Sequence, residues 1–367
     1  MRHKIITGND YSSDIALDFI PTVIVGFFQA GGEDQFFAHY TSLKKRFPDV
    51  EVMGCNSESN ITNEIPYVDL DGKNPCVFML FEMKREAFSI QLFSTDETIE
   101  VEENKKYSAM MLVAEYNETI EETLVGIKHV IGTGSIYGAI AGQTIDSDGK
   151  VLLFYNGAFL EQGHLLWLID NAYYKFKGMS IHNFEPVGME LNITNAKDKT
   201  IFEIEEEPAL EIIESMMGTL TPESLASYDH PFFIWSEQNR YICNEVMPVT
   251  TLRRVNHSEK SLELFKGVHS GDKLSVAIPL DKKGQEKMFE KLIQNIEKDS
   301  VGFLFTCIAF KAHWGEMEPL YLMHLTQMSG LEFAGLHTFG EIGPHSPECS
   351  SAVQNQTLTL VTLNETR

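Results

Sequence analysis

The chain has 367 residues, with 29 basic against 53 acidic side chains and a formal net charge of −24. This acidic excess argues against nucleic acid or an anionic membrane as the main partner, because both attract cationic surfaces. At this length two domains are expected, and an apolar content of 43% is enough to build their cores.

The cysteines and the N-terminus bear on the compartment. Cys55, Cys76, Cys243, Cys307 and Cys349 are scattered singly, without a CxxC pair, a zinc spacing or a haem-attachment CxxCH motif. Such a dispersed, odd set is typical of a reducing compartment. The N-terminus lacks the apolar core of a signal peptide, and no stretch approaches 18 apolar residues. The sequence therefore predicts a cytoplasmic protein without membrane insertion.

The first predicted elements form a strand–helix–strand unit. The β-branched run at 21–28 predicts a buried strand, and residues 50–53 predict a second one. Between them, residues 33–47 predict a helix that Pro48 ends. Its apolar face would carry Phe36, Phe37, Tyr40, Leu43 and Phe47. A unit of this kind calls for parallel pairing and a right-handed crossover.

Small and polar residues follow the second strand, in the order Gly54, Cys55, Asn56, Ser57. A loop here would lie at the carboxyl end of a parallel strand, where open α/β sheets bind ligands. These four residues are therefore candidates for ligand binding. Catalysis by Cys55 is disfavoured, because no base lies near it in the sequence.

Strands dominate the middle of the chain. They are predicted at 75–81, 87–93 and 109–114, as a pair at 150–157 and 164–169, and as a hairpin at 187–193 and 199–204. Residues 118–130 predict a helix, and the glycine-rich stretch 131–142 follows it. Its GxGxxxG spacing after a helix does not fit a dinucleotide fingerprint and predicts a close-approach loop. The turn at 145–149 lacks most ligands of a calcium loop.

The second half begins with a helix start at Pro208, where acidic residues suit the helix dipole. That helix is expected to end at Gly218. Further strands are predicted at 231–235, 262–265, 273–278, 301–308 and 331–336, and helices at 284–297 and 318–328. The predicted class is α/β to α+β, with two domains of mixed β-sheets flanked by helices. Residues 1–20 form an N-terminal extension, and the domains cover 21–205 and 206–363.

One carboxylate, Glu341, lies in a glycine-rich turn between two apolar segments. Gly340 and Gly343 can adopt positive φ angles, and Pro344 restricts the residue before it. Two roles stay open for Glu341. It contacts a ligand, or it caps backbone amides and locks the two halves of the chain together.

Six short motifs along the chain point to one family. They are Phe47-Pro48 with 52–57, Tyr155-Asn156-Gly157 with His164-Leu165-Leu166, 184–188 with 193–196, 207–210, 302–307, and 339–344. In this order they resemble the FIST N and FIST C domains, with a FIST N-like domain over 21–205 and a FIST C-like domain over 206–363.

The resemblance implies an intracellular sensory module that binds a small ligand. Such a module would regulate a histidine kinase or a cyclic-di-nucleotide signalling protein. A stand-alone branch of the family binds haem and senses nitric oxide through a partner kinase, and this chain resembles that branch because no output domain is attached. One departure concerns the FIST C cysteine motif, which often continues into Gly-Arg. Here Cys307 is followed by Ile308, so the arginine that would clamp an amino-acid carboxylate is missing.

Haem b would need an axial ligand in an apolar pocket. His230 is the preferred candidate, because Phe232, Phe233 and Trp235 follow it and would shield a macrocycle. Alternative axial ligands are His182, His313 and His324.

Two other functions stay open. The protein would sense a small polar metabolite such as an amino acid, without haem, held between 54–57 and Glu341. An uncharacterised enzyme is the third possibility. It is disfavoured because the chain shows no HExxH, P-loop, GxSxG or Ser-Lys motif.

Overall fold

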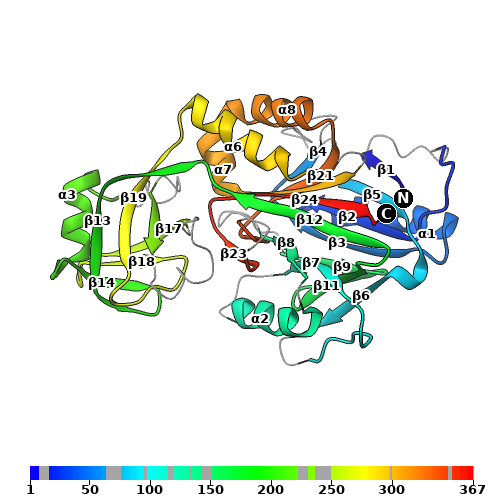
Figure 1. Cartoon of the computed structure of the whole chain (residues 1–367), viewed down its shortest axis with the longest axis horizontal. Helices are drawn as coiled ribbons and strands as arrows, with labels where there is room; N and C mark the ends of the chain where they lie inside the picture. The colour runs from blue at the N-terminus through cyan, green and yellow to red at the C-terminus, as the bar shows by residue number, and fades with distance from the viewer. Residues whose placement is uncertain are drawn as a thin grey trace.

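The protein consists of a large body and a smaller lobe, which are joined through β13 (Phe184–Lys197) and β19 (Lys273–Pro279) (Figure 1). This computed structural model describes residues 1–7, 16–62, 76–94, 97–114, 119–132, 134–142, 150–221, 230–235, 249–297, 300–345 and 349–366. Parallel and antiparallel pairs occur in the same sheets, and helices flank them. The predicted class of mixed α/β sheets is therefore confirmed.

The body is built from one topological module that occurs three times. Each module begins with an outer strand and a first central strand. A helix, a second central strand and a short strand follow, and a return strand ends the module. Module I contains β1 (Arg2–Thr7), β2 (Val23–Gln29), α1 (Glu33–Arg46), β3 (Glu51–Ser57), β4 (Asn60–Thr62) and β5 (Cys76–Glu82). Module II contains β6 (Phe88–Phe93), β7 (Tyr107–Val113), α2 (Ile120–Ile131), β8 (Ile136–Ile140), β9 (Leu153–Tyr155), β10 (Ala158–Leu160) and β11 (His164–Asp170).

Module III contains the C-terminal elements of the body. These are β12 (Tyr174–Ile181), α6 (Lys282–Gln294), β20 (Val301–Cys307), α7 (Ile308–Trp314), α8 (Glu318–Ser329), β21 (Glu332–Thr338), β22 (Glu341–Gly343), β23 (Ala352–Gln354) and β24 (Leu358–Glu365). Short 3-10 turns lie at Arg85–Ala87 and Gly315–Met317.

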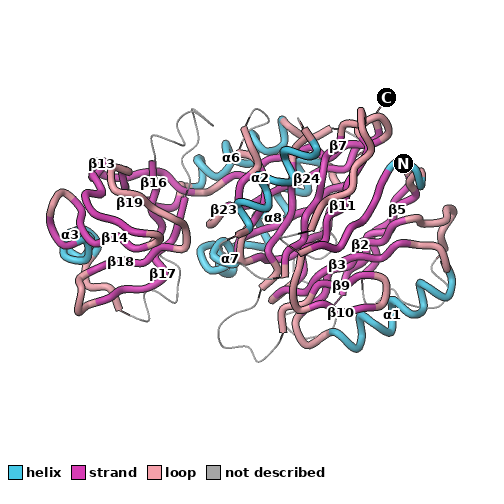
Figure 2. The backbone as a smooth tube through the Cα atoms, turned by 90° about the horizontal axis from the view of Figure 1, so that it is seen from below, coloured by secondary structure: helices cyan, strands magenta, loops and turns pink. Residues whose placement is uncertain are grey.

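Strand exchange ties the modules together. The central pairs β2–β3, β7–β8 and β20–β21 are parallel, as the predicted strand–helix–strand unit requires. Each short strand then joins a neighbouring sheet: β9 pairs with β3, β4 with β21, and β22 with β8. Module I gives β4, module II gives β9 and β10, and module III gives β22 and β23, so each sheet is completed by the next module and the three sheets are linked in a ring. Figure 2 shows these sheets beside one another, with α1 on the side away from the lobe.

A glycine stands at the same place in the second central strand of every module. A Cβ atom at Gly54, Gly138 or Gly335 would lie 1.9, 1.8 or 1.7 Å from a backbone carbonyl oxygen of the paired strand. Only a residue without a side chain allows this approach. Close approach was expected for 131–142, and Gly138 confirms it, but within strand β8 and not in a loop.

All three modules contribute to one apolar core inside the ring. Its aromatic members include Phe27 and Phe81 from module I, Trp167 from module II, and Phe303 and Phe305 from module III. The rings pack edge to face or tilted, for example Phe27 on Phe305 with centroids 6.0 Å apart. Each such ring buries about 150–250 Å², so this core is the main stabilising element of the body.

The lobe is an insertion into module III, between β12 and α6. Its strands form one sheet in the order β13-β19-β16-β17-β18-β14-β15. Besides β13 and β19 it contains β14 (Thr200–Ile204), β15 (Glu207–Pro208), α3 (Ala209–Met217), β16 (Pro231–Trp235), β17 (Val249–Asn256) and β18 (Ser261–Leu264). The predicted boundary between 205 and 206 falls inside this lobe, since β14 pairs with β15 and β18.

Several local predictions differ from the structure. Residues 54–57 are part of strand β3, and Glu341 lies in strand β22, because exchanged strands extend both pairings. The predicted extension 1–20 contains β1, which pairs with β5. The strand at 164–170 pairs with β6 and β7, whereas the hairpin around Asn156 joins β9 to β10. On α1, Phe37 is 41% exposed. The turn at 145–149 lies outside the described residues.

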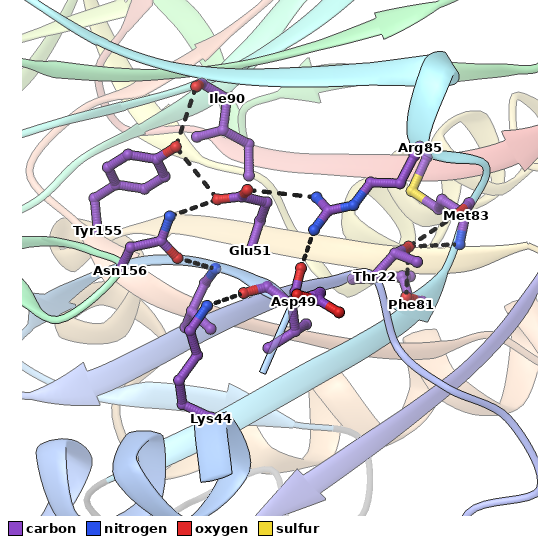
Figure 3. Close-up of polar contacts among 12 residues, drawn as sticks. Thr22, Lys44, Asp49, Glu51, Phe81, Met83, Arg85, Ile90, Tyr155 and Asn156 are labelled. Carbon is purple, nitrogen blue, oxygen red and sulfur yellow. Dashed lines mark hydrogen bonds and ion pairs between the residues drawn. The ribbon is translucent and has the colours of Figure 1, made fainter. Parts of the chain in front are cut away.

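Asn156 locks the β9–β10 hairpin onto the start of β3 (Figure 3). Its φ of 45° suits a tight hairpin turn, and asparagine tolerates that region better than most residues. Its Oδ1 accepts a hydrogen bond from the Val52 amide at 2.9 Å, and its Nδ2 donates to Glu51. Glu51 also accepts from the Tyr155 hydroxyl at 3.3 Å. A structural role thus accounts for the Tyr155-Asn156-Gly157 motif.

Candidate functional site

The cysteines are poor candidates for chemistry. Cys55, Cys76 and Cys307 are free and buried, and burial raises the pKa of each thiol, to about 12 for Cys76. A thiol with such a pKa stays protonated and unreactive near neutral pH. Cys349, by contrast, is disulfide-bonded, which a dispersed cysteine set did not lead us to expect.

Asn56 and Ser57 use their polar atoms within the fold. Asn56 accepts from the Leu152 amide at 2.7 Å and donates to the Lys150 carbonyl oxygen at 2.6 Å. The Ser57 hydroxyl contacts the Gly142 carbonyl oxygen at 3.1 Å. Together with Gly54 and Cys55, these residues are buried between strands. Their contact with a ligand stays a prediction.

Glu341 is fully buried and joins β22 to the residue just before β24. Its Oε1 accepts from the Thr338 hydroxyl, and its Oε2 accepts from the Thr357 amide at 3.3 Å and hydroxyl at 2.6 Å. Burial raises the pKa of this carboxyl to about 8, against the opposing effect of both threonines and Lys266. Because both oxygens are engaged inside the protein, the geometry favours the alternative in which Glu341 fastens the fold.

Lys266 follows β18 in the lobe and lies within electrostatic range of Glu121 in α2 and of Glu341. Desolvation lowers the pKa of its ammonium group, although both carboxylates act to raise it. The side chain nevertheless keeps accessible surface. Among the described residues, no carboxylate forms an ion pair with it. Lys266 is thus crowded by protein but still reached by water, on the part of the lobe that faces Glu121 and Glu341 of the body.

Glu121 is the carboxylate of the body that acts most strongly on the pKa of Lys266. Its Oε1 accepts from the Val353 amide at 3.2 Å. Desolvation raises the pKa of its carboxyl in spite of Lys266, although much of the residue is exposed. Within the described part of the chain its Oε2 makes no hydrogen bond, so that oxygen is available to a ligand.

Two neutral imidazoles lie near these charges. Burial lowers the pKa of His345 to about 3 and that of His182 to about 4, and their ring centroids are 6.4 Å apart. His345 contacts the Ser180 carbonyl oxygen through Nδ1 at 3.2 Å. Its buried Nε2 has no hydrogen-bond partner in the described part of the protein. That nitrogen can therefore bind a polar ligand or a water molecule.

Adjacent chain segments connect the lobe to the body. Phe184 pairs with Pro279, and the Leu280 amide donates to the Asn183 carbonyl oxygen at 2.6 Å. Gln356 of the body also donates to the Thr251 hydroxyl of the lobe. Two neighbouring strands can serve as a hinge, because small changes in backbone angles there rotate the whole lobe.

The residues around His230 do not fit a haem group. Phe232 is buried in the apolar core of the lobe, and Phe233 is buried against Phe184 and Ala277. Both rings are therefore engaged in packing and do not shield a macrocycle at His230. Within the described ranges, no group of three or more histidine, cysteine, aspartate and glutamate residues could hold a metal ion. Haem b stays a prediction from the resemblance.

The FIST N domain matches residues 23–207, which is half of the chain and runs from β2 to the start of β15. The chain belongs to the FIST family. Membership indicates a sensory role in signal transduction, based on binding a small ligand. No curated protein matches the sequence. No helix in the described part of this FIST protein is long and apolar enough to cross a membrane.

Lys266, Glu121 and His345 carry no signal in the sequence of this FIST protein. Each lies outside any recognisable motif, in a charged or polar local context that also fits a solvated surface. They meet only because the lobe is inserted into module III and β22 joins the sheet of module II. The position of the lobe and the pairing of β22 both depend on tertiary structure. Local sequence patterns therefore could not reveal that these three residues lie close together.

Proposed function

We propose that this protein senses a small polar ligand that carries both an anionic and a cationic group, such as an amino acid. We place the ligand between lobe and body, beside Lys266 and Glu121, and call this place the cleft. Lys266 carries the proposal, because a crowded lysine without an ion-pair partner gains most from an anionic group that enters its cleft. The open oxygen of Glu121 then accepts hydrogen bonds from the cationic group.

Glu341 does not contact this ligand. It is fully buried, and burial raises its pKa to about 8, so near neutral pH it is mostly protonated and adds little charge. The unpartnered Nε2 of His345 offers a further polar contact. Many FIST C domains have an arginine after the cysteine that corresponds to Cys307, and this chain lacks it. In our proposal Lys266 supplies the positive charge that binds the anionic group instead. Haem is no part of this proposal, because the surroundings of His230 do not fit it.

Ligand binding is coupled to the position of the lobe. A ligand held by Lys266 of the lobe and Glu121 of the body contacts both parts only when the cleft is closed. It therefore favours the closed state by its differential affinity for the two states. A separate histidine kinase or cyclic-di-nucleotide signalling protein would respond to the changed surface.

A thermal-shift screen against the common amino acids tests the proposal. A ligand that binds only the folded state raises the melting temperature. The Lys266→Gln variant should lose that rise. Lys273→Gln is the matched control, because Lys273 is a lobe lysine in an exposed ion pair with Glu190 at 3.0 Å. The proposal is wrong if Lys266→Gln responds to the same ligands as strongly as the Lys273→Gln protein.

A further inference from the structure

Three segments that lie far apart in the sequence meet at a serine, a histidine and a glutamate. Ser59 lies between β3 and β4, His337 in β21, and Glu318 at the start of α8. The Ser59 Oγ is 2.7 Å from His337 Nδ1, and His337 Nε2 is 2.6 Å from Glu318 Oε1. Lys311 of α7 donates from Nζ to the same Ser59 Oγ at 3.3 Å.

One tautomer of His337 gives these hydrogen bonds the direction that a nucleophile needs. With its proton on Nε2, the imidazole donates to Glu318 Oε1. Nδ1 then holds the lone pair and accepts from the Ser59 hydroxyl. Lys311 can only donate, which leaves the hydroxyl proton of Ser59 directed at the imidazole. This is the arrangement of a nucleophile, its base and the group that orients the base.

The four residues Ser59, His337, Glu318 and Lys311 differ in how much of each is exposed to water. The side chains of His337 and Glu318 are 3% and 0% exposed. Ser59 is only partly buried, and the Lys311 side chain is 25% exposed. The base and the carboxylate are thus shielded from water, whereas Ser59 as a residue and the Lys311 side chain keep some accessible surface. A substrate would approach Ser59 from that accessible side.

The fold does not require a histidine at this place. Counted from the equivalent glycines, His337 corresponds to Asn56 in module I and to Ile140 in module II. Both of these residues are buried without any ionisable group. The same strand position is therefore filled stably by an amide or an alkyl side chain. The His337–Glu318 pair is an addition that the topology itself does not explain.

We propose that Ser59 is an acyl-transfer nucleophile that acts on an acyl ester, an activity beyond the sensory function proposed above. The Ser59 Oγ forms a bond to the acyl carbon while its proton passes to His337 Nδ1. The ester C–O bond then breaks, and the leaving alcohol takes that proton. Water attacks the acyl-serine, gives its proton to His337, and releases the acid and the free serine. Glu318 positions His337, and Lys311 stabilises the oxyanion.

A fluorophosphonate probe tests this assignment on the full chain. Ser59 should form a bond to phosphorus as fluoride leaves, and peptide mass mapping should place the label on Ser59. The Ser59→Ala variant should lose the label completely, whereas Ser42→Ala in α1 should keep it. Lys266→Gln should also label normally, which separates this site from the cleft.

Two further measurements test the roles of the base and the carboxylate. His337→Gln should slow labelling by about 10²-fold or more. Glu318→Gln should slow it less, and the conservative Glu318→Asp variant should recover part of the rate. Equal labelling of the Ser59→Ala and unaltered proteins, or a label that maps elsewhere, would overturn the proposal. So would a labelling rate of the His337→Gln protein equal to that of the unaltered protein.

Discussion

His337 and Thr338 are neighbours in β21, and their side chains leave the strand on opposite faces. His337 contacts Ser59 and Glu318, whereas Thr338 donates to Glu341 on the side of the lobe cleft. A shift of one residue in register would exchange the two environments. The parallel pairing of β21 with β20, and its antiparallel pairing with β4, therefore keep the contacts of His337 apart from those of Thr338.

The buried carboxyl of Glu341 should make stability depend on pH. Its pKa is raised from 4.5 to about 8, so the folded state binds this proton more tightly than the unfolded state. The stability from this group is present below about pH 4.5 and is lost as pH rises through about 8. Glu341→Gln mimics the protonated acid. At pH 9 it should exceed the unaltered protein in unfolding free energy by on the order of 3 kcal/mol.

Chemical denaturation at several pH values checks this expectation. The two proteins should have equal stability near pH 5 and diverge as the pH rises. Glu341→Ala serves as the control for the fastening role. It should be less stable than Glu341→Gln by about 3 kcal/mol at every pH, because Thr338 and Thr357 lose their buried acceptor and neither variant titrates at this position. A pH-independent difference between the Gln variant and the unaltered protein would contradict the raised pKa.

The equivalent glycines of the modules should not tolerate alanine. Gly54→Ala, Gly138→Ala and Gly335→Ala each place a Cβ within 2 Å of a backbone oxygen, which only a shift of the paired strands can relieve. Each should lower the unfolding free energy by more than about 3 kcal/mol. Gly126→Ala in exposed α2 meets nothing within 4 Å and should instead stabilise by about 0.5–1 kcal/mol. Equal melting of all four variants would refute the account of the modules.

Asn156 should contribute through both its side chain and its backbone angle. Asn156→Ala removes hydrogen bonds to β3 and leaves alanine at a φ of 45°. The expected loss is about 2–3 kcal/mol, measured by urea unfolding. Asn156→Gly keeps the favourable angle and removes only the side-chain bonds, so it should lose less. If the glycine variant is no more stable than the alanine variant, backbone strain plays no part.

The buried thiols should resist alkylation. Burial raises the pKa of Cys55, Cys76 and Cys307, so the native protein should leave all three unmodified by iodoacetamide at pH 8. In urea all three should react. Peptide mass spectrometry gives the modified positions. Rapid modification of native Cys55 would restore it as a candidate nucleophile.

Local patterns were sufficient for most elements but not for their partners. Apolar periodicity predicts α1, and a run of β-branched residues predicts β2. Both patterns are visible in the sequence because they involve residues that are close together in the chain. The strand at 54–57 was taken for a loop, since its polar residues are buried by hydrogen bonds to Lys150, Leu152 and His337, about 95 or 280 positions away. No window of a single sequence contains such information.

The candidate sites were predicted in part for the same reason. Glu341 stood out because glycines surround it, and it proved to be a perturbed, buried carboxyl. Lys266 and Ser59 lack such neighbours. Each gains its environment from strand exchange or from the inserted lobe, so each was found only in the folded structure.

Calorimetric titration of the cleft tests the central claim most directly. The ligand is the amino acid that gives the largest rise in melting temperature. Lys266→Gln should weaken its binding about 10–100-fold, the effect of losing one charged hydrogen bond, while Lys273→Gln binds normally. Affinity of the Lys266→Gln protein within twofold of the unaltered protein would contradict a ligand site between lobe and body.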